Sequence, residues 1–127
     1  MGNLENDIVK IVYANKKTER QCTSLKEATK LFGGNKAMAL SLLSRVNSIS
    51  QADVINDIRV NRSLRFHNLK GRYNGHFAID VKSIKEKWRI ILRPLDENEN
   101  AFDPCHIDEI AMIVRIVEIK EVSAHYE

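Results

Sequence analysis

Apolar residues in the first half of the chain recur mostly at helical spacing. The exception is residues 8–14, a short β-branched run that predicts an opening strand. Residues 24–27 read Ser-Leu-Lys-Glu and fit a capping box, and the helix that they begin is expected to end at the glycines 33 and 34. Residues 35–46 carry a second apolar stripe, and residues 50–58 predict a short third helix or turn.

From residue 64 onward, apolar and polar residues alternate, which is typical of half-buried strands. Four strands are expected, over residues 64–69, 77–81, 88–93 and 110–122. The glycines at 71 and 75 bound a turn between the first two of these strands. Pro94 is expected to end the third strand, because proline cannot donate to a strand ladder. An acidic connection over residues 96–109 then leads to the last strand.

The order of these elements predicts the fold class. An N-terminal strand, two or three helices and then an antiparallel twisted sheet of three to four strands make an α+β fold, with the helices on one face of the sheet. The other face is free to be concave and polar, as antiparallel sheets permit. A chain of 127 residues, 43% of them hydrophobic, fits a single domain over residues 1–127 with one modest core.

Composition excludes several classes of protein. Two cysteines, Cys22 and Cys105, are too few for a disulfide framework, and with His106 they lack the paired spacing of a zinc site. No apolar run approaches the roughly 18 residues that span a bilayer, so no membrane contact is expected. The first residues lack the basic and then apolar pattern of a signal peptide, which favours a cytoplasmic protein.

The net charge of +3 conceals a strong asymmetry along the chain. Residues 59–94 contain ten Lys or Arg and two acids, a net of +8. Residues 95–127 contain nine acids against two cations, a net of −7. A basic central segment is what a polyanion-binding surface requires, although two oppositely charged and solvated faces would give the same totals.

Three segments within the basic region carry a resemblance to a known family. Residues 65–72 read Arg-Phe-His-Asn-Leu-Lys-Gly-Arg, residues 75–81 read Gly-His-Phe-Ala-Ile-Asp-Val, and residues 88–92 read Trp-Arg-Ile-Ile-Leu. As a set they resemble the HigB-type core of the RelE/ParE superfamily of bacterial toxins. In that family an Arg-x-His-x-Leu-x-Gly segment precedes a Gly-aromatic-Ala strand and an Arg-Ile/Leu-Ile/Val strand.

The resemblance implies a RelE-like toxin of a type II toxin–antitoxin module. HigB-type members are mRNA endonucleases that act at the ribosome and use no metal or other cofactor. The expected partners are the ribosome, its mRNA and a cognate antitoxin of the helix-turn-helix, HigA-like type, with DNA contacted only through the antitoxin complex. The ParE branch shares the fold but inhibits DNA gyrase, so a non-nuclease gyrase inhibitor is the alternative.

The chain departs from the family pattern at two places. It carries the acidic insertion over residues 96–109, and Ala124 stands where related tails often have a polar or acidic residue. Ala124 is either natural or an inactivating substitution. A third interpretation therefore stays open, in which the chain is an inactivated toxin that acts as an antitoxin-bound co-repressor.

Metal-free RNA cleavage defines the chemistry expected of such a site. The 2′-hydroxyl of one nucleotide attacks its own 3′-phosphate, so the reaction needs a base, cations for the developing charge and an acid for the departing oxygen. Arginine suits the charge because its planar fork binds two phosphate oxygens and stays protonated. We therefore take Arg89 as the first candidate for the scissile phosphate, with Arg72 and Arg93 behind it.

Imidazole and phenol groups supply the candidates for proton transfer. His125 is the main acid–base candidate because an imidazole titrates near neutral pH, and Tyr126 stacks on a base or assists the transfer. His67 is either a further catalytic group or a strand residue that bridges its neighbours. Trp88 could stack on RNA, but its place at the start of a strand favours core packing. Six cations are expected to hold RNA or ribosomal phosphates: Arg62, Arg65, Lys70, Lys85, Lys87 and Arg93.

Overall fold

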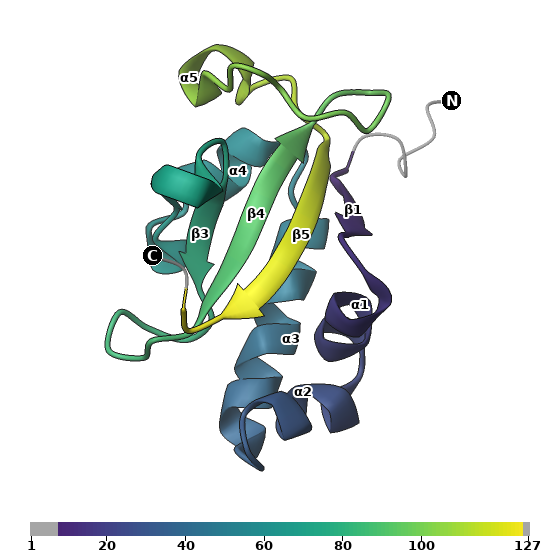
Figure 1. Ribbon diagram of the computed structural model, residues 1–127, viewed down its shortest axis with the longest axis vertical. Coiled ribbons are helices and arrows are strands. Elements are labelled where there is room, and N and C mark those ends of the chain that lie inside the picture. The colour runs from purple at the N-terminus through teal and green to yellow at the C-terminus, as the bar shows by residue number, and fades with distance from the viewer. Residues whose placement is uncertain (1–7, 126–127) are drawn as a thin grey trace.

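One five-stranded sheet organises the chain, and helices cover one of its faces (Figure 1). The computed structural model describes residues 8–125. The strands follow the spatial order β1-β5-β4-β3-β2, with β1 parallel to β5 and every other pair antiparallel. Their bounds are β1 Lys10–Tyr13, β2 His67–Asn68, β3 Phe77–Asp80, β4 Arg89–Leu95 and β5 Ile116–Ser123. The predicted α+β fold class is confirmed.

Four α-helices lie between β1 and the rest of the sheet in sequence, and polar side chains cap the first three of them. The α-helices are α1 Lys16–Thr23, α2 Leu25–Leu31, α3 Lys36–Ser50, α4 Ile55–Arg59 and α5 Ile107–Ile110, and two 3₁₀ turns are η2 Arg62–Leu64 and η3 Gly71–Tyr73. Asn15, Ser24 and Asn35 each accept a hydrogen bond from a backbone N–H in the first turn of the following helix. The helix start expected at Ser24 is confirmed.

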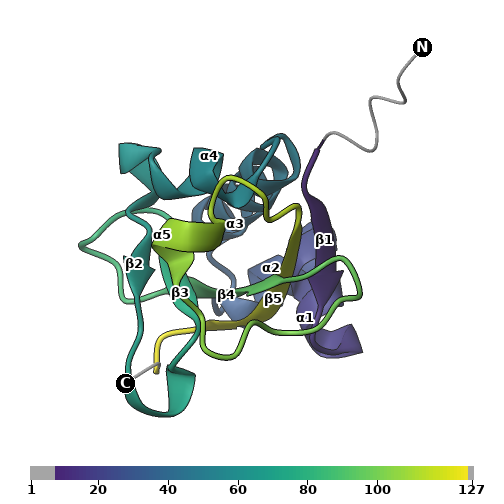
Figure 2. The same cartoon turned by 90° about the horizontal axis from the view of Figure 1, so that it is seen from above.

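The main core lies between the helices and one face of the sheet. Alternate strand residues such as Ile79, Ile90 and Val117 are fully buried there, against Leu42 and Ile49 of α3. The opposite face carries a smaller apolar cluster of Leu69, Tyr73, Ala78 and Ile91, surrounded by charged side chains. Seen from above in Figure 2, the teal turn that follows β2 lies on that side of the sheet, and α3 and α4 lie on the other.

Several element boundaries differ from those predicted. β4 continues through Pro94 to Leu95, because β3 pairs with β4 only as far as Leu92 and Pro94 therefore needs no N–H on that side. The strand expected over residues 64–69 is reduced to β2, since η2 occupies its beginning and Arg65 has a left-handed backbone (φ 54°).

The last strand was predicted to begin too early, and α1 was not predicted. Residues 107–113 form α5 and a turn rather than the start of a strand, so β5 begins only at Ile116. The sequence pattern gave no signal for α1, because its only buried side chains are Thr18 and Cys22 and it has no apolar stripe.

Candidate functional site

A cavity of about 410 Å³ opens where the loop between β3 and β4 meets the end of the chain after β5. We call it the loop cavity. Eight residues line it: Arg72, Ile84, Lys85, Glu86, Lys87, Arg89, Ala124 and His125. Four of these are cations that do not depend on pH near neutrality, and one is an acid. The lining is therefore strongly basic, as a phosphate site requires.

Three of the five predicted catalytic residues meet in this cavity. Arg72 comes from η3, Arg89 from the start of β4 and His125 from the segment after β5. Tyr126 lies outside the described residues. His67 does not line the cavity; its Nδ1 lies 2.7 Å from the backbone oxygen of Arg65, so the structure supports its reading as a strand residue that bridges neighbours.

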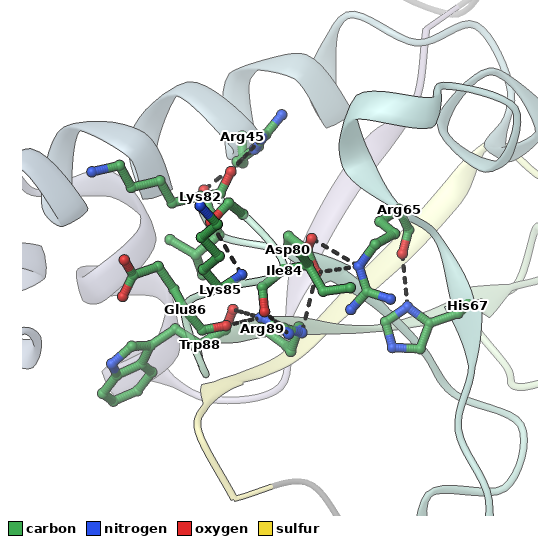
Figure 3. Close-up of polar contacts among 12 residues, drawn as sticks. Arg45, Arg65, His67, Asp80, Lys82, Ile84, Lys85, Glu86, Trp88 and Arg89 are labelled. Carbon is green, nitrogen blue, oxygen red and sulfur yellow. Dashed lines mark hydrogen bonds and ion pairs between the residues drawn. The ribbon is translucent and has the colours of Figure 1, made fainter.

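Arg89 has a structural environment that its sequence context did not reveal. Its side chain is 5% exposed, and its Nε lies 3.1 Å from Oδ1 of Asp80. Its Nη1 donates to the carbonyl oxygens of Glu86 and Trp88, and its Nη2 donates to that of Ile84 at 3.4 Å (Figure 3). The guanidinium thus holds the loop of residues 84–88 in place, and these contacts occupy the N–H groups expected to bind the scissile phosphate.

Asp80 is the anion that joins two of the predicted site arginines. Its carboxylate is 3% exposed and also accepts hydrogen bonds from Nε of Arg65, at 2.9 and 3.2 Å. The pairing follows from strand register, because Asp80 on β3 lies directly opposite Arg89 on β4. Figure 3 shows Arg65 and Arg89 approaching Asp80 from different elements. Arg65 is therefore paired with a buried carboxylate, although its own side chain is 38% exposed.

Arg72 and His125 are both exposed in the cavity lining, and a hydrogen bond joins them. Nη2 of Arg72 donates to the backbone oxygen of His125 at 3.5 Å, and the guanidinium lies 5.0 Å from the centre of the Tyr73 ring. The backbone N–H of His125 donates to Oγ of Ser123 at 2.9 Å. These contacts hold His125 beside η3, and the side chains of Arg72 and His125 remain exposed to a ligand.

Tyr73 and Glu121 form a pair that sequence reasoning missed. The Tyr73 hydroxyl donates a hydrogen bond to Oε1 of Glu121 across the open face of the sheet. This hydrogen bond, reinforced by burial, raises the pKa of Tyr73 above its usual range. The only signal available in the sequence was that Glu121 belongs to the polar positions of β5. Its partner depends on how η3 folds over the sheet.

The remaining predicted phosphate contacts separate into three groups. Lys85 and Lys87 are exposed and line the loop cavity, as an RNA contact would require. Arg93 instead makes two hydrogen bonds to Oε1 of Glu118 on β5, at 2.8 and 3.1 Å. Arg62 and Lys70 are exposed but do not line this cavity. The basic character of the site therefore resides mainly in Arg72 and the two lysines.

Comparisons with known proteins leave the chain without an assigned relative. No protein-family model, curated protein or solved structure matches it. Within residues 8–125, no three His, Cys, Asp or Glu side chains gather in a way that could hold a metal ion. None of the helices in that part of the chain is long and apolar enough to cross a membrane.

Proposed function

We propose that this chain is a HigB-type toxin of a type II toxin–antitoxin module, a metal-independent endoribonuclease that cleaves mRNA on the ribosome. The observation that carries the proposal is the convergence of Arg72, His125, Lys85 and Lys87 on the loop cavity from three separate segments. A basic cavity with one exposed imidazole is the minimum that cleavage by the neighbouring 2′-hydroxyl needs. The three motif segments that resemble the HigB core add independent support.

The proposed reaction divides the work between the exposed groups. The 2′-oxygen attacks the adjacent phosphorus while a base takes its proton, and the bond to the 5′-oxygen breaks as an acid protonates that oxygen. The products are a 2′,3′-cyclic phosphate and a 5′-hydroxyl. His125 carries one of the two proton transfers, and Arg72 binds the phosphate oxygens as negative charge develops. Lys85 and Lys87 add positive charge at the rim of the cavity.

Arg89 has an indirect role in this scheme. Because its guanidinium is committed to Asp80 and to three loop carbonyls, it positions the loop that bears Lys85 and Lys87. The proposed setting is the cytoplasm, with the ribosome and its mRNA as the target. A helix-turn-helix antitoxin is the proposed neutralising partner, and DNA is reached only through the complex of the two proteins.

The decisive experiment is cleavage in a reconstituted translation reaction. Two identical messages, one with and one without a functional start site, are incubated with ribosomes and the purified chain, and the new 5′ ends are mapped. We expect cuts on the translated message only, reduced about 10²-fold or more in His125→Ala. The matched control is Lys82→Gln, an exposed charge change outside the loop cavity. Equal cleavage by wild type and His125→Ala would refute the site.

The inactivated-toxin interpretation has one observation in its favour. Ala124 lines the loop cavity beside His125 but supplies no functional group, at the position where related tails often carry one. If wild type fails to cleave and Ala124→Asp cleaves translated mRNA, the chain is an inactivated toxin. Gyrase-dependent DNA damage without loss of mRNA would instead assign the chain to the ParE-like alternative.

A further inference from the structure

The loop cavity is the first of four hollows that share residues in series. His125 lines both the loop cavity and a second hollow of about 260 Å³, which also contains Trp88 and Lys17 and which we call the Trp88 hollow. Lys17 in turn lines a third hollow between α1 and α2, together with Lys30. Lys30 continues into a fourth hollow, at the end of α2 and the start of α3. The series links the candidate site to the helices.

Cations dominate the helical part of this series. Residues 16–36 contain six Lys or Arg and two acids, which gives this segment a net charge of +4. The acids Glu19 and Glu27 make ion pairs with Lys16 at 3.8 Å and Lys30 at 3.6 Å. The other four cations make no ion pair within residues 8–125; they are Lys17, Arg20, Lys26 and Lys36.

Trp88 stands where the loop cavity meets this basic surface. It is half-buried, and the edge-to-face contact with Phe32, with ring centroids 5.0 Å apart, fixes its position. Its backbone oxygen accepts from Arg89, while Figure 3 shows its indole pointing away from the Asp80–Arg89 cluster. The preference for core packing is thus partly supported, but part of the ring is available in the hollow that His125 also lines.

We infer that the Trp88 hollow binds a nucleobase next to the cleaved linkage, and that Lys17, Arg20 and Lys30 bind the phosphates of the nucleotides beyond it. The inference rests on the proposed function and extends its site to a binding track for single-stranded RNA. An aromatic ring followed by cations is the arrangement that single-strand binders use, because every base can stack and every nucleotide carries a phosphate.

The aromatic ring is what favours RNA over an acidic protein partner. A carboxylate-rich segment would use the lysines and the arginine but would gain little from an indole in the same groove. Three acids also line the series: Glu86 in the loop cavity, Glu121 in the Trp88 hollow and Glu27 in the third hollow. They leave the track with a net positive charge, and Glu121 accepts a hydrogen bond from Tyr73.

The test uses the single tryptophan of the chain as its reporter. The full chain is titrated with a 2′-O-methyl RNA of about 12 nucleotides, which it cannot cleave, while the tryptophan emission is recorded. We expect the emission to be quenched on binding. Labelled RNA and anisotropy then give the affinity of Trp88 variants, with Trp88→Phe close to wild type and Trp88→Leu weaker by about 5-fold or more.

Salt dependence tests the phosphate contacts with a charge-matched control. Lys17→Gln/Arg20→Gln removes two charges on the track, and Lys82→Gln/Lys120→Gln removes two exposed charges outside all four hollows. The slope of log affinity against log salt is negative. Its magnitude is expected to decrease by about 1.4 for the first variant and to stay near the wild-type value for the second.

Several results would overturn the inference. They are unchanged emission on adding RNA, equal salt slopes for the two double variants, and quenching by polyglutamate as strong as that by RNA. None of these results depends on cleavage. If the chain binds RNA in this way but cuts no translated message, the proposed function is refuted and the RNA-binding track is supported. If the chain cuts translated messages but RNA does not quench its tryptophan, the track is refuted and the proposed function is supported.

Discussion

Asp80 and Arg89 form a buried ion pair beneath the candidate site, with 3.1 Å between Oδ1 of the aspartate and Nε of the arginine. Their side chains are 3% and 5% exposed. The same carboxylate also binds Arg65, and the same guanidinium donates to three carbonyls of residues 84–88, in the loop between β3 and β4. A single pair thus connects the sheet to the loop that carries the cavity lysines.

Removing the negative charge of this pair is expected to destabilise the fold strongly. Asp80→Asn leaves the Arg89 cation buried without its counter-charge, and we expect a loss of about 3 kcal/mol in the free energy of unfolding, measured by urea denaturation. Glu118→Gln is the matched control, because its partner Arg93 is 32% exposed and the expected loss is about 1 kcal/mol or less. Equal losses in the two variants would contradict a special role for Asp80.

Arg89 and Arg72 are expected to differ in how their loss reduces cleavage. Arg89→Lys keeps a charge near Asp80 but loses the planar fork that binds the loop carbonyls, so we expect it to lose about 1 to 2 kcal/mol of stability along with activity. Arg72→Lys changes an exposed side chain, so cleavage should fall with little change in the urea midpoint. Measuring unfolding and cleavage for both variants separates positioning from direct phosphate contact.

The role of Arg89 depends on long-range contacts and was not predictable from the sequence. The α+β class, the Ser24 cap and the alternating core residues of β3 to β5 follow from local patterns, which the sequence displays directly. The Asp80–Arg89 pair depends on the register of two strands, and the Tyr73–Glu121 pair on the packing of η3 over the sheet. Neither relationship can be obtained from spacing along the chain.

The residues that meet at the loop cavity were also only partly predictable from the sequence. The sequence identified Arg72, Arg89 and His125 as candidates, and the structure places all three at one cavity. The sequence could not show which arginines pair with an acid inside the protein. Arg65 and Arg93 were predicted as RNA contacts, and the structure pairs them with Asp80 on β3 and Glu118 on β5.

Loss of the Tyr73 hydroxyl should affect stability because it leaves a carboxylate without its donor. Tyr73 is 8% exposed, and Tyr73→Phe keeps the ring in the small apolar cluster while removing the hydrogen bond to Glu121. We expect a loss of about 1 to 2 kcal/mol in urea unfolding. The double variant Tyr73→Phe/Glu121→Gln should lose less than the sum of the single variants, because the two groups interact. Strict additivity would argue against the pair.

The two cysteines are expected to react with thiol reagents at very different rates. Burial raises the pKa of Cys22 to about 12, and its side chain is 2% exposed. Cys105 is half-buried beside Gly75, and burial raises its pKa as well. Alkylation of the native chain should therefore modify Cys105 first and Cys22 only after unfolding, which mass spectrometry of timed samples measures. Early modification of Cys22 would show that α1 opens from the core without global unfolding.

Acid sensitivity of the fold should depend on His76, the buried imidazole on the open side of the sheet. Burial lowers its pKa, and the Arg93 and Lys120 cations also lower it. The Asn74 carbonyl and the Glu118 carboxylate act in the opposite direction, and the pKa stays below its usual value. Its Nε2 is buried without a hydrogen-bond partner among residues 8–125. The unfolded chain therefore binds a proton at His76 at about pH 6.5, while the folded chain does so only at lower pH.

The sign of the effect follows from this difference in proton binding. Between about pH 6.5 and the lowered pKa the unfolded state holds more protons, so the free energy of unfolding decreases as pH falls through that interval. His76→Gln should flatten this dependence in urea titrations from about pH 7 to pH 5, whereas His106→Gln, at an exposed position, should not. If wild type and His76→Gln lose stability at the same rate on acidification, His76 must take up its proton as readily in the folded chain as in the unfolded one.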